Sequence, residues 1–508
     1  MTYDYLIVGS GSAGAVLAAR LSEDTATSVL LIEAGPDFAT LEELPDEIKY
    51  AWFPNSDGNL GVKANSYDWG FKGKATNESP NIEVPRGKVI GGSSSTNAQG
   101  FIRGIPEDFN EWVELGNNTW SFDNALKYYK KSENDLDIQD DFHGSDGPII
   151  ARRFKESELT NISLDFYNSC KSFGFDDSYD INHPDSTGVG ALPFNNPDRI
   201  RWSASIGYLN DIRNRENLTI ISNCFVNKIL FDHLTATGVK ADILGKEHTY
   251  TALNVILSAG AICSPQLLML SGIGNTNYLQ KLGIEPIYDL PSVGQNLRDH
   301  PRIPLMWESV NQIALKKHQS PLQVVLRYTS VNSNFRNDIY MIIAAVSADQ
   351  TVRMGVGLYK AKSSGSITLS TSDPYTQPVI DYNYFNDDFD LRRMRDAVRL
   401  ACNIISSKYF SEAENYPKGM NEIILSDDNN LNSWIRTNVD TFHHISGTCK
   451  MGLINDPTSV VDQFGNVKGV KNLRIVDASI MPDCVRANTN ATVIMMAEKI
   501  ADDIKSGN

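Results

Sequence analysis

A glycine-rich turn near the N-terminus has the residues needed to bind the phosphates of a dinucleotide. The apolar residues 5–8 lead into Gly9-Ser10-Gly11-Ser12-Ala13-Gly14, and a helix-forming run then continues to Leu21. In such a pattern the first glycine permits a tight turn, the second lets a pyrophosphate approach the backbone, and the third allows close packing of helix on strand. The free N–H groups at the start of the helix then face the phosphate anion.

An acidic residue follows at the distance that this chemistry requires. Residues 29–32 predict a second apolar strand, and Glu33 stands 19 positions after Gly14. A carboxylate at the tip of that strand can accept hydrogen bonds from both ribose hydroxyls, and it disfavours a 2′-phosphate. A glycine-rich hairpin, the alternative, explains neither the preceding strand nor Glu33. We therefore predict dinucleotide binding, with NAD and FAD both open at this point.

Further blocks combine glycine with small polar residues. Residues 85–97 read PRGKVIGGSSSTN, in which glycines and hydroxyl residues can bring backbone N–H groups near a flat polar ring or a phosphate. The other blocks, in chain order, are GAICSPQLLMLSGIG at 260–274, GQNLRDHP at 294–301, HHISGTCKMG at 443–452, VDAS at 476–479 and NTN at 488–490.

With these blocks in this order, the chain resembles the glucose-methanol-choline (GMC) family of FAD-dependent oxidoreductases over essentially its full length. The resemblance implies that the dinucleotide is FAD. Thr96 stands where some members carry a histidine that binds FAD covalently, so the resemblance implies non-covalent FAD here. The cofactor-binding positions that it implies are Gly9, Gly11, Ser12, Gly14, Glu33, Ala34, Gly87, Gly91, Gly92, Ser93, Asn97, Ala98, Val226, Asp477, Ala478 and Thr489.

The family's active-site pair falls on His444 and Asn488. Alcohol oxidation needs a base for the hydroxyl proton while hydride leaves the carbon, and imidazole, with an ordinary pKa near ~6.5, is largely neutral at pH 7. We predict His444 as this base, with Asn488 orienting the substrate oxygen. The chain departs from the family on both sides of the base, with His443 where an aromatic residue is common and Ile445 where proline is common.

Other polar residues receive weaker predictions. His443 is a candidate for the wall of the substrate pocket, and Arg486 is a candidate ligand for an anionic substrate group, with a surface ion pair as the alternative. His300 is interpreted as structural support. The remaining histidines, interpreted as satisfied core or surface residues, are His143, His183, His233, His248 and His318. With no HxH or HExxH spacing, we predict no metal site.

The order of the motifs requires a discontinuous cofactor domain. We predict an α/β fold (α+β overall) with a Rossmann-like FAD-binding domain, built from residues 1–155, 200–301 and 470–508 around a parallel sheet with helices on both faces. Residues 156–199 and 302–469 should form a substrate-binding cap with a mixed or antiparallel sheet. The expected strands are 218–230 (two), 249–257, 322–329 and 338–347, and the expected helices are 264–270, 391–405 and 492–504. The arginines of the helix over 391–405 (Arg392, Arg393, Arg395 and Arg399) are interpreted as part of a solvated helix face.

Composition excludes several classes of function. The 508 residues suffice for more than one core. A net charge of −16 without a Lys/Arg cluster argues against nucleic-acid binding. The sequence has no uninterrupted apolar stretch of about 18 residues, so we predict no membrane span, and the N-terminus lacks the basic start of a signal peptide. The six cysteines have no CxxC spacing and are expected to be reduced thiols, so we predict a cytoplasmic protein.

The leading hypothesis is oxidation of a small primary alcohol to an aldehyde, with hydride passing to flavin N5. Whether oxygen or a quinone or another carrier accepts the electrons stays open. Two alternatives are a hydroxynitrile lyase that uses the same histidine beside redox-silent FAD, and a flavin-binding protein without turnover. Asn488 in place of a second histidine argues against the lyase, and the presence of both His444 and Asn488 argues against the inactive protein.

Overall fold

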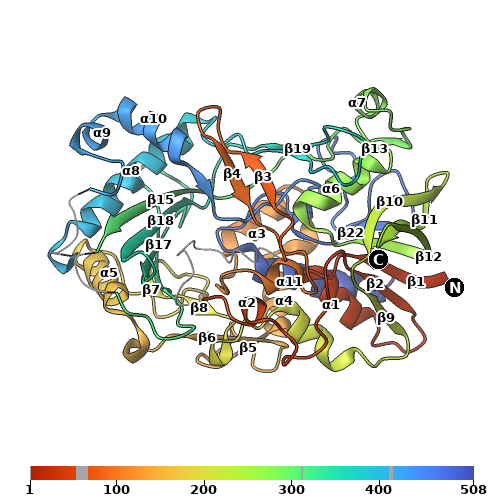
Figure 1. Cartoon of the computed structure of the whole chain (residues 1–508), viewed down its shortest axis with the longest axis horizontal. Helices are drawn as coiled ribbons and strands as arrows, with labels where there is room; N and C mark the ends of the chain where they lie inside the picture. Colours follow the sequence, from red (N-terminus) through yellow and green to blue (C-terminus); the bar gives the residue numbers. More distant parts are fainter. Residues whose placement is uncertain (1, 53–66, 310–312, 411–415) are drawn as a thin grey trace.

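Two large β-sheets, one on each side of the molecule, set the architecture. The computed structural model describes residues 2–52, 67–309, 313–410 and 416–508. In Figure 1 a seven-stranded sheet lies on the right, with both chain termini beside it, and a six-stranded sheet lies on the left. This mixed α/β architecture confirms the predicted fold class.

The seven-stranded sheet has the order β10-β11-β12-β1-β2-β9, with β22 paired to β12. Strands β12, β1, β2, β9 and β22 run parallel, whereas β10, β11 and the first half of β12 form an antiparallel meander, so the sheet is mixed rather than purely parallel. The bounds are β1 Thr2–Val8, β2 Val29–Ile32, β9 Leu218–Ile221, β10 Phe225–Asp232, β11 Thr235–Ile243, β12 Lys246–Leu257 and β22 Leu473–Ile475. All seven strands come from the three segments assigned to the cofactor domain.

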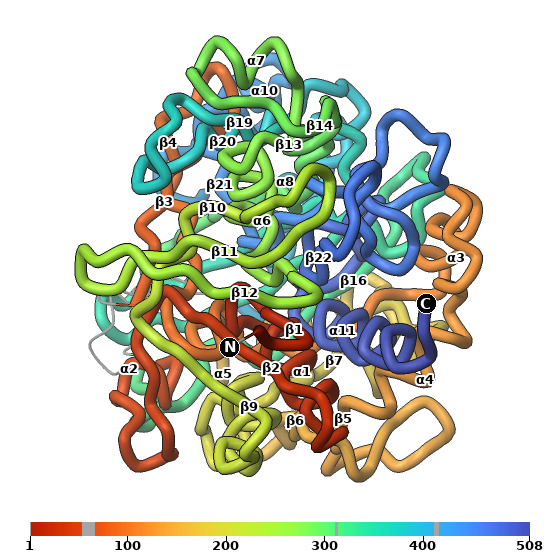
Figure 2. The backbone as a smooth tube through the Cα atoms, turned by 90° about the vertical axis from the view of Figure 1, so that its right-hand side faces the viewer, coloured from red at the N-terminus to blue at the C-terminus, as the bar shows by residue number. Residues whose placement is uncertain are grey.

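Helices from the two ends of the chain pack side by side next to this sheet. Figure 2 shows α1 (Ser12–Leu21) against α11 (Thr489–Lys505), with α4 (Phe122–Ser132) on the other side of α11. Arg20 of α1 reaches the fully buried carboxylate of Glu498 of α11 at 2.8 Å, and the hydroxyl of Tyr208 donates to the same carboxylate. This ion pair ties residues 478 positions apart into one unit.

The six-stranded sheet is antiparallel throughout, in the order β21-β15-β18-β17-β16-β7. Every residue of β17 is buried, as expected for a central strand with both faces covered. Helices α5 (Asn161–Ser172) and α8 (Asp388–Ile405) pack against this sheet. The strand bounds are β7 Gly188–Ala191, β15 Pro301–Glu308, β16 Leu322–Tyr328, β17 Ile339–Val346, β18 Thr351–Leu358 and β21 Asp440–Thr441.

Smaller sheets cross the boundary predicted between the two domains. One pairs β3 and β4 with β19 and β20, and another pairs β5 and β6 with β8. The bounds are β3 Phe71–Lys74, β4 Asn81–Val84, β5 Glu133–Asp135, β6 Ile149–Arg153, β8 Pro193–Phe194, β13 Ile273–Gly274, β14 Tyr288–Asp289, β19 Ser366–Thr368 and β20 Val379–Asp381. The remaining helices are α2 Asp46–Lys49, α3 Pro106–Glu114, α6 Gly260–Leu270, α7 Thr276–Lys281, α9 Glu422–Ser426 and α10 Asp428–Asn438.

The helix expected over 264–270 begins four residues earlier, as α6, and Pro265 therefore lies inside it. A proline leaves the carbonyl four residues before it without a helical donor. Here that carbonyl belongs to Ala261, and the Thr448 hydroxyl donates to it at 2.6 Å. At the start of α6, the Asp477 carboxylate accepts the Gly260 N–H at 3.0 Å. Both partners are distant in sequence, so the local pattern misplaced the helix start.

Arg393 of α8 is not on a solvated helix face, as the sequence had suggested for the arginines of 391–405. Its side chain is buried, and it forms ion pairs with Asp338 at 2.8 Å and Asp390 at 2.7 Å. A guanidinium is kept inside a protein only when its charge is paired and its N–H groups are bonded. Arg393 therefore ties α8 to the start of β17.

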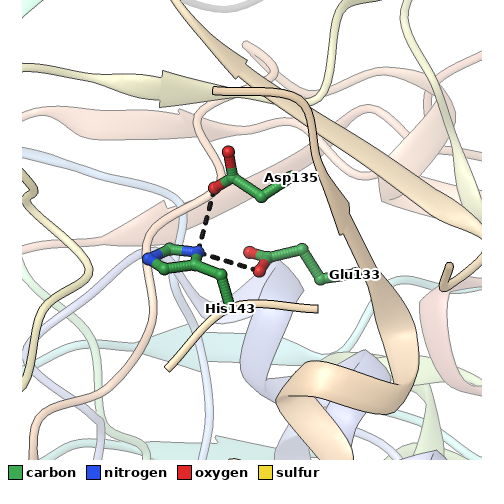
Figure 3. Close-up of side chains that lie close together, drawn as sticks. All are labelled: Glu133, Asp135 and His143. Carbon is green, nitrogen blue, oxygen red and sulfur yellow. Dashed lines mark hydrogen bonds and ion pairs between the residues drawn. The ribbon is translucent and has the colours of Figure 1, made fainter. Parts of the chain in front are cut away.

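His143 lies inside a buried network of charges (Figure 3). Its Nδ1 is 3.0 Å from Glu133 and 2.9 Å from Asp135, and its Nε2 is 3.0 Å from Asp180. Carboxylates accept hydrogen bonds, so both ring nitrogens must donate, which requires the imidazolium form. The three carboxylates accordingly raise the pKa of His143 to about 10 against the opposing effect of burial. His143 is a satisfied core residue, as predicted, but a charged one.

The same network holds two arginines. Arg103 pairs with Glu133, and Arg153 pairs with Asp135 at 2.7 Å and Asp180 at 2.8 Å. Three positive side chains thus balance three negative ones. Glu133, Asp135 and His143 each offer a ligand atom within 4.8 Å of the others, but guanidinium and imidazolium groups already bind Glu133 Oε2 and both oxygens of Asp135. The network therefore functions as a charge-balanced tie between residues 133–153 and the loop at residue 180.

We predict that His143→Gln destabilises the protein by about 3–5 kcal/mol near pH 6, because it leaves a buried negative charge unpaired. Since the pKa of His143 is raised, its contribution is complete below about pH 6.5 and is lost as the pH rises toward 10. Melting temperatures of wild type and variant, measured from pH 6 to 10, should therefore converge at the alkaline end. The matched control is His233→Gln, whose side chain is 96% exposed. A constant gap across this range would contradict the charged-histidine interpretation.

Candidate active site

One cavity of about 580 Å³ runs between the two sheets. Its lining combines the N-terminal glycine turn, the block at 85–97, the start of α6, the residues after β21 and the start of α11. Strands β15, β16 and β17 of the six-stranded sheet supply its opposite wall. The motifs that sequence analysis singled out thus meet around a single space.

At one end of the cavity, two glycine turns touch each other without side chains between them. Gly9 has φ +93°, and a Cβ on Gly92 would lie 2.7 Å from the Cα of Gly11. Gly11 is the N-cap of α1 and no side chain caps that helix, so its first N–H groups stay free. Ser12 and Ala13, which carry those groups, line the cavity. This end offers the N–H donors and positive helix end that a phosphate anion needs.

Most of the residues predicted to bind the cofactor line this cavity, namely Gly9, Gly11, Ser12, Glu33, Ala34, Gly87, Gly92, Ser93, Asn97, Ala98, Val226, Asp477, Ala478 and Thr489. Gly14 and Gly91 do not. A Cβ on Gly14 would overlap the carbonyl oxygen of Gly9, and a Cβ on Gly91 would overlap the Ser95 hydroxyl. Both glycines are required by packing on neighbouring turns rather than by an open approach to a ligand.

Glu33 lies at the tip of β2, where the carboxylate was expected. It accepts hydrogen bonds from the backbone N–H of Ser10 at 3.0 Å and of Gly35 at 2.9 Å, and from the Ser10 hydroxyl at 2.7 Å. A carboxylate has about four acceptor positions, so capacity remains on the cavity side. Burial raises the pKa of Glu33, and these hydrogen bonds oppose that rise.

At the other end, His444 and Asn488 face each other. His444 Nε2 is 3.1 Å from Asn488 Nδ2, and both residues line the cavity. Asn488 is the N-cap of α11, yet its side chain makes no capping bond to that helix. Asparagine is among the best capping residues, so an asparagine turned away from its own helix is held for another contact.

His300 completes a chain of three side chains. Its Nδ1 lies 2.9 Å from His444 Nδ1, and its ring stacks on Tyr359 at 4.0 Å between centroids. The Asn488 amide nitrogen can only donate, so His444 Nε2 accepts its hydrogen bond, and the proton of His444 sits on Nδ1 and is donated to His300. The lone pair of His444 Nε2 is thereby directed to the side where Asn488 and the cavity lie. His300 is thus more than the structural support suggested by sequence.

Asp299 fixes the backbone on which both histidines stand. Its buried carboxylate accepts the N–H of His300 at 2.7 Å and of His444 at 2.8 Å. The hydroxyls of Thr441 and Tyr384 donate to the second oxygen at 2.6 and 3.1 Å. Burial raises the pKa of Asp299, while the hydrogen bonds favour its charged form.

The imidazoles of this end are held neutral. Burial lowers the pKa of His444 well below its ordinary value, and the charges of Arg86 and Arg302 lower it further. Burial likewise lowers the pKa of His443 and of His300 to about 3. His443 lies on the cavity wall with φ +67°, a left-handed conformation that is uncommon outside glycine.

Arg486 does not reach the cavity. Its side chain is buried, and it pairs with Asp108 at 3.2 Å and Glu111 at 2.6 Å. The prediction that it binds an anionic substrate group is therefore wrong, and so is the alternative of a surface ion pair. Its guanidinium instead anchors the turn before Asn488 to helix α3.

Several lining residues escaped the sequence analysis because they come from the six-stranded sheet β21-β15-β18-β17-β16-β7, the cap sheet. Tyr340, Ile342 and Arg302 belong to its strands, and Tyr359 and Phe442 follow strands of it. Alternating strands carry such residues on either face, and no local signal marks which face a cavity will adjoin. Trp69 and Lys88 were likewise not singled out, although Lys88 lies within the block at 85–97.

Buried polar atoms without partners mark where a ligand would bind. Among the described lining residues they include the Ser258 hydroxyl, Asn490 Nδ2 and Asn488 Oδ1. Unpaired buried polar atoms are rare in folded proteins unless a bound group satisfies them. Together with the uncapped start of α1 and the open side of Glu33, they fit a long ligand with a diphosphate and a polar ring.

Fold and cavity define an α/β protein whose cavity has glycine turns and an open helix N-terminus suited to a dinucleotide at one end and a neutral histidine–amide pair at the other. Comparison with known proteins gives the family. The GMC oxidoreductase models match residues 3–302 and 361–497. The chain belongs to the GMC oxidoreductase family and is an oxidoreductase of that type.

Named relatives agree with this assignment. The chain is 32% identical to the oxygen-dependent choline dehydrogenase of Vibrio vulnificus (98% of this chain, 94% of the relative) and 34% identical to the mitochondrial choline dehydrogenase of Homo sapiens (99% and 90%). Among solved structures, pyridoxine 4-oxidase from Mesorbium loti superposes with a TM-score of 0.90 at 28% identity, covering 99% of each chain. Within the described part of the chain, no helix has the length and apolarity to cross a bilayer.

Proposed function

We propose that this chain oxidises a small primary alcohol to the aldehyde, with non-covalent FAD as the cofactor. The observation that carries the proposal is the 3.1 Å contact between His444 Nε2 and Asn488 at the edge of the cavity. It supplies a neutral base and an orienting amide side by side, in a family of oxidoreductases whose named relatives include choline dehydrogenases.

FAD, when bound, supplies the acceptor for the hydride that leaves the carbinol carbon. The substrate hydroxyl replaces the Asn488 N–H at His444 Nε2, which then takes the hydroxyl proton while the Nδ1 proton stays hydrogen-bonded to His300. Asn488 binds the substrate oxygen through its carboxamide and keeps it beside His444. The new positive charge on His444 is shared with His300 along the 2.9 Å hydrogen bond.

The cofactor would be held along the cavity from the glycine turns to the block at 85–97. The start of α1 and Gly92 would face the diphosphate, and Glu33 the adenosine ribose. Thr96 has no ring nitrogen with which to form a covalent link to a flavin, which supports a dissociable cofactor. Molecular oxygen or a quinone or another carrier would remove the electrons. Six free cysteines support a reducing compartment, the cytoplasm.

The first test is flavin reduction without oxygen. We expect primary alcohols to bleach the flavin absorbance of the wild type, and His444→Ala to slow the bleaching by about 10²–10⁴-fold while FAD stays bound, because the proton acceptor is lost. The exposed His233→Ala is the control and should leave the rate unchanged. Unimpaired bleaching in His444→Ala would overturn the base assignment. Release of cyanide from mandelonitrile without bleaching by any alcohol would overturn the proposed reaction.

The pH profile of kcat/KM should lack an acid limb in the ordinary histidine range. The active form of His444 is neutral, and its pKa lies well below 6.5, so protonation removes activity only at a correspondingly lower pH. We expect a constant value from about pH 7.5 down to about pH 5.5. Half-loss of kcat/KM near pH 6.5 would show that burial does not lower the pKa of the base.

The cofactor should dissociate when the protein unfolds. Acid precipitation of the loaded protein is expected to leave the flavin in the supernatant, measured by its absorbance, since Thr96 cannot form a histidyl-type link. Added FAD should also raise the melting temperature of protein stripped of flavin, because a ligand that binds only the folded state stabilises it. A yellow pellet would contradict non-covalent binding.

A further inference from the structure

The cap sheet places one positive side chain on the cavity wall. Arg302 is the second residue of β15, and its register partner on β18 is Gly357, which in turn pairs with Tyr340 on β17. Residues directly opposite each other in an antiparallel sheet project to the same face. Arg302 and Tyr340 both line the cavity, so this row of the sheet faces the bound substrate.

Glycine in the middle of that row makes room for an aromatic ring. A Cβ on Gly357 would overlap the ring of Phe442, and a Cβ on Gly355 would lie 3.2 Å from the same ring. Phe442 therefore packs over these two glycines, and the Arg302 guanidinium sits 5.7 Å from the centre of its ring. The aromatic ring thus helps to hold the side chain of Arg302, which lines the cavity.

The hydrogen bonds of Arg302 are incomplete. One terminal nitrogen, Nη2, pairs with Asp440, and neither Nε nor the other terminal nitrogen, Nη1, has a partner among the described residues. Arg302 as a whole is only 9% exposed. A buried N–H of a charged group without an acceptor is costly, and a ligand that brings an oxygen acceptor removes this cost.

The charges at the end of the cavity near His443 and His444 favour the binding of an anion. Carboxylates among the described lining residues are Glu33, Asp68 and Asp477, and the first and last are bonded to N–H and hydroxyl groups at the nucleotide end. Asp440 is not part of the lining. Near the two histidines the positive groups are Arg302 and Arg86, and Nη2 of Arg86 is also buried without a partner.

We propose that Arg302 binds a carboxylate carried by the alcohol substrate, so that the enzyme oxidises a hydroxyl on an organic acid rather than a quaternary ammonium alcohol. This inference rests on the proposed function and names its substrate class. The terminal nitrogen Nη1 of Arg302 donates to the carboxylate, while Asp440 binds the other terminal nitrogen, Nη2. The hydroxyl then lies toward His444 and Asn488.

Matched alcohols test the proposal on the FAD-loaded enzyme. We expect anaerobic flavin reduction by 4-hydroxybutanoate to have a kcat/KM at least about tenfold above that of 1-butanol, and choline to be the poorest of the three. Equal values for the acid and the neutral alcohol, or a preference for choline, would overturn the inference. If neither these three compounds nor any other primary alcohol reduces the flavin, the proposed function itself is overturned.

Variants locate the effect on Arg302. Arg302→Gln should lower kcat/KM for 4-hydroxybutanoate by about 10- to 100-fold and leave 1-butanol within about threefold, because only the charged hydrogen bonds are lost. Asp440→Asn should increase the preference for the acid, and the double variant R302Q/D440N, which removes both charges, should abolish it. Arg336→Gln is the matched control, since Arg336 pairs with Glu107 at 2.6 Å and does not line the cavity.

A binding measurement provides a readout without turnover. Butanoate should bind the FAD-loaded wild type, seen as a shift in the flavin spectrum, and about 10- to 100-fold more weakly to Arg302→Gln. If Arg302→Gln does not fold, Arg302→Lys keeps the charge but not the fork geometry and should weaken butanoate binding by a smaller factor. Unchanged butanoate affinity in the folded variants would overturn the proposal.

Discussion

The Asp299 carboxylate is the interaction on which the arrangement of the active site depends. It accepts the backbone N–H groups of His300 and His444, which belong to blocks 144 residues apart. Burying a carboxylate is costly, and four donors, one from β21 and three from loop residues, offset that cost here. Because each donor needs this acceptor, the two imidazoles meet at hydrogen-bonding distance only when the blocks are docked. The catalytic geometry is therefore a product of tertiary folding rather than of either block alone.

The same dependence links the other motifs. Proline in α6 leaves the Ala261 carbonyl without a helical donor, and the Thr448 hydroxyl from the block of the base supplies one. Asp477 caps the start of α6 from the C-terminal segment. Gly11 and Gly92 touch because neither has a side chain. Each of these short motifs thus supplies one side of a tertiary contact, and the small or polar type of each residue is explained by the partner that it contacts.

Sequence was informative where the signal is local or periodic. The apolar run of β2, the glycine turn and the helix at the C-terminus were located well because propensity and packing agree there. The start of α6 and the burial of Arg393 were misjudged, since Asp477, Thr448 and Asp338 act from distant segments. The cavity wall formed by strands of the cap sheet was missed for a similar reason. Side chains alternate between the two faces of a strand, and the sequence does not show which face will line a cavity. Arg486 was misplaced because its partners lie on α3.

At the end of the cavity that holds His444, the charge is carried by groups that do not titrate near neutral pH. His444, His443 and His300 are kept neutral by burial, while guanidinium groups supply the positive field. An amide at position 488 fits this scheme, because it orients an oxygen without adding a group that could capture the proton. A second histidine there would compete with His444 for protons and couple the two titrations. In the proposed mechanism the site therefore separates its tasks: a single base moves the proton, the amide positions the substrate oxygen, and fixed charges select which substrate binds.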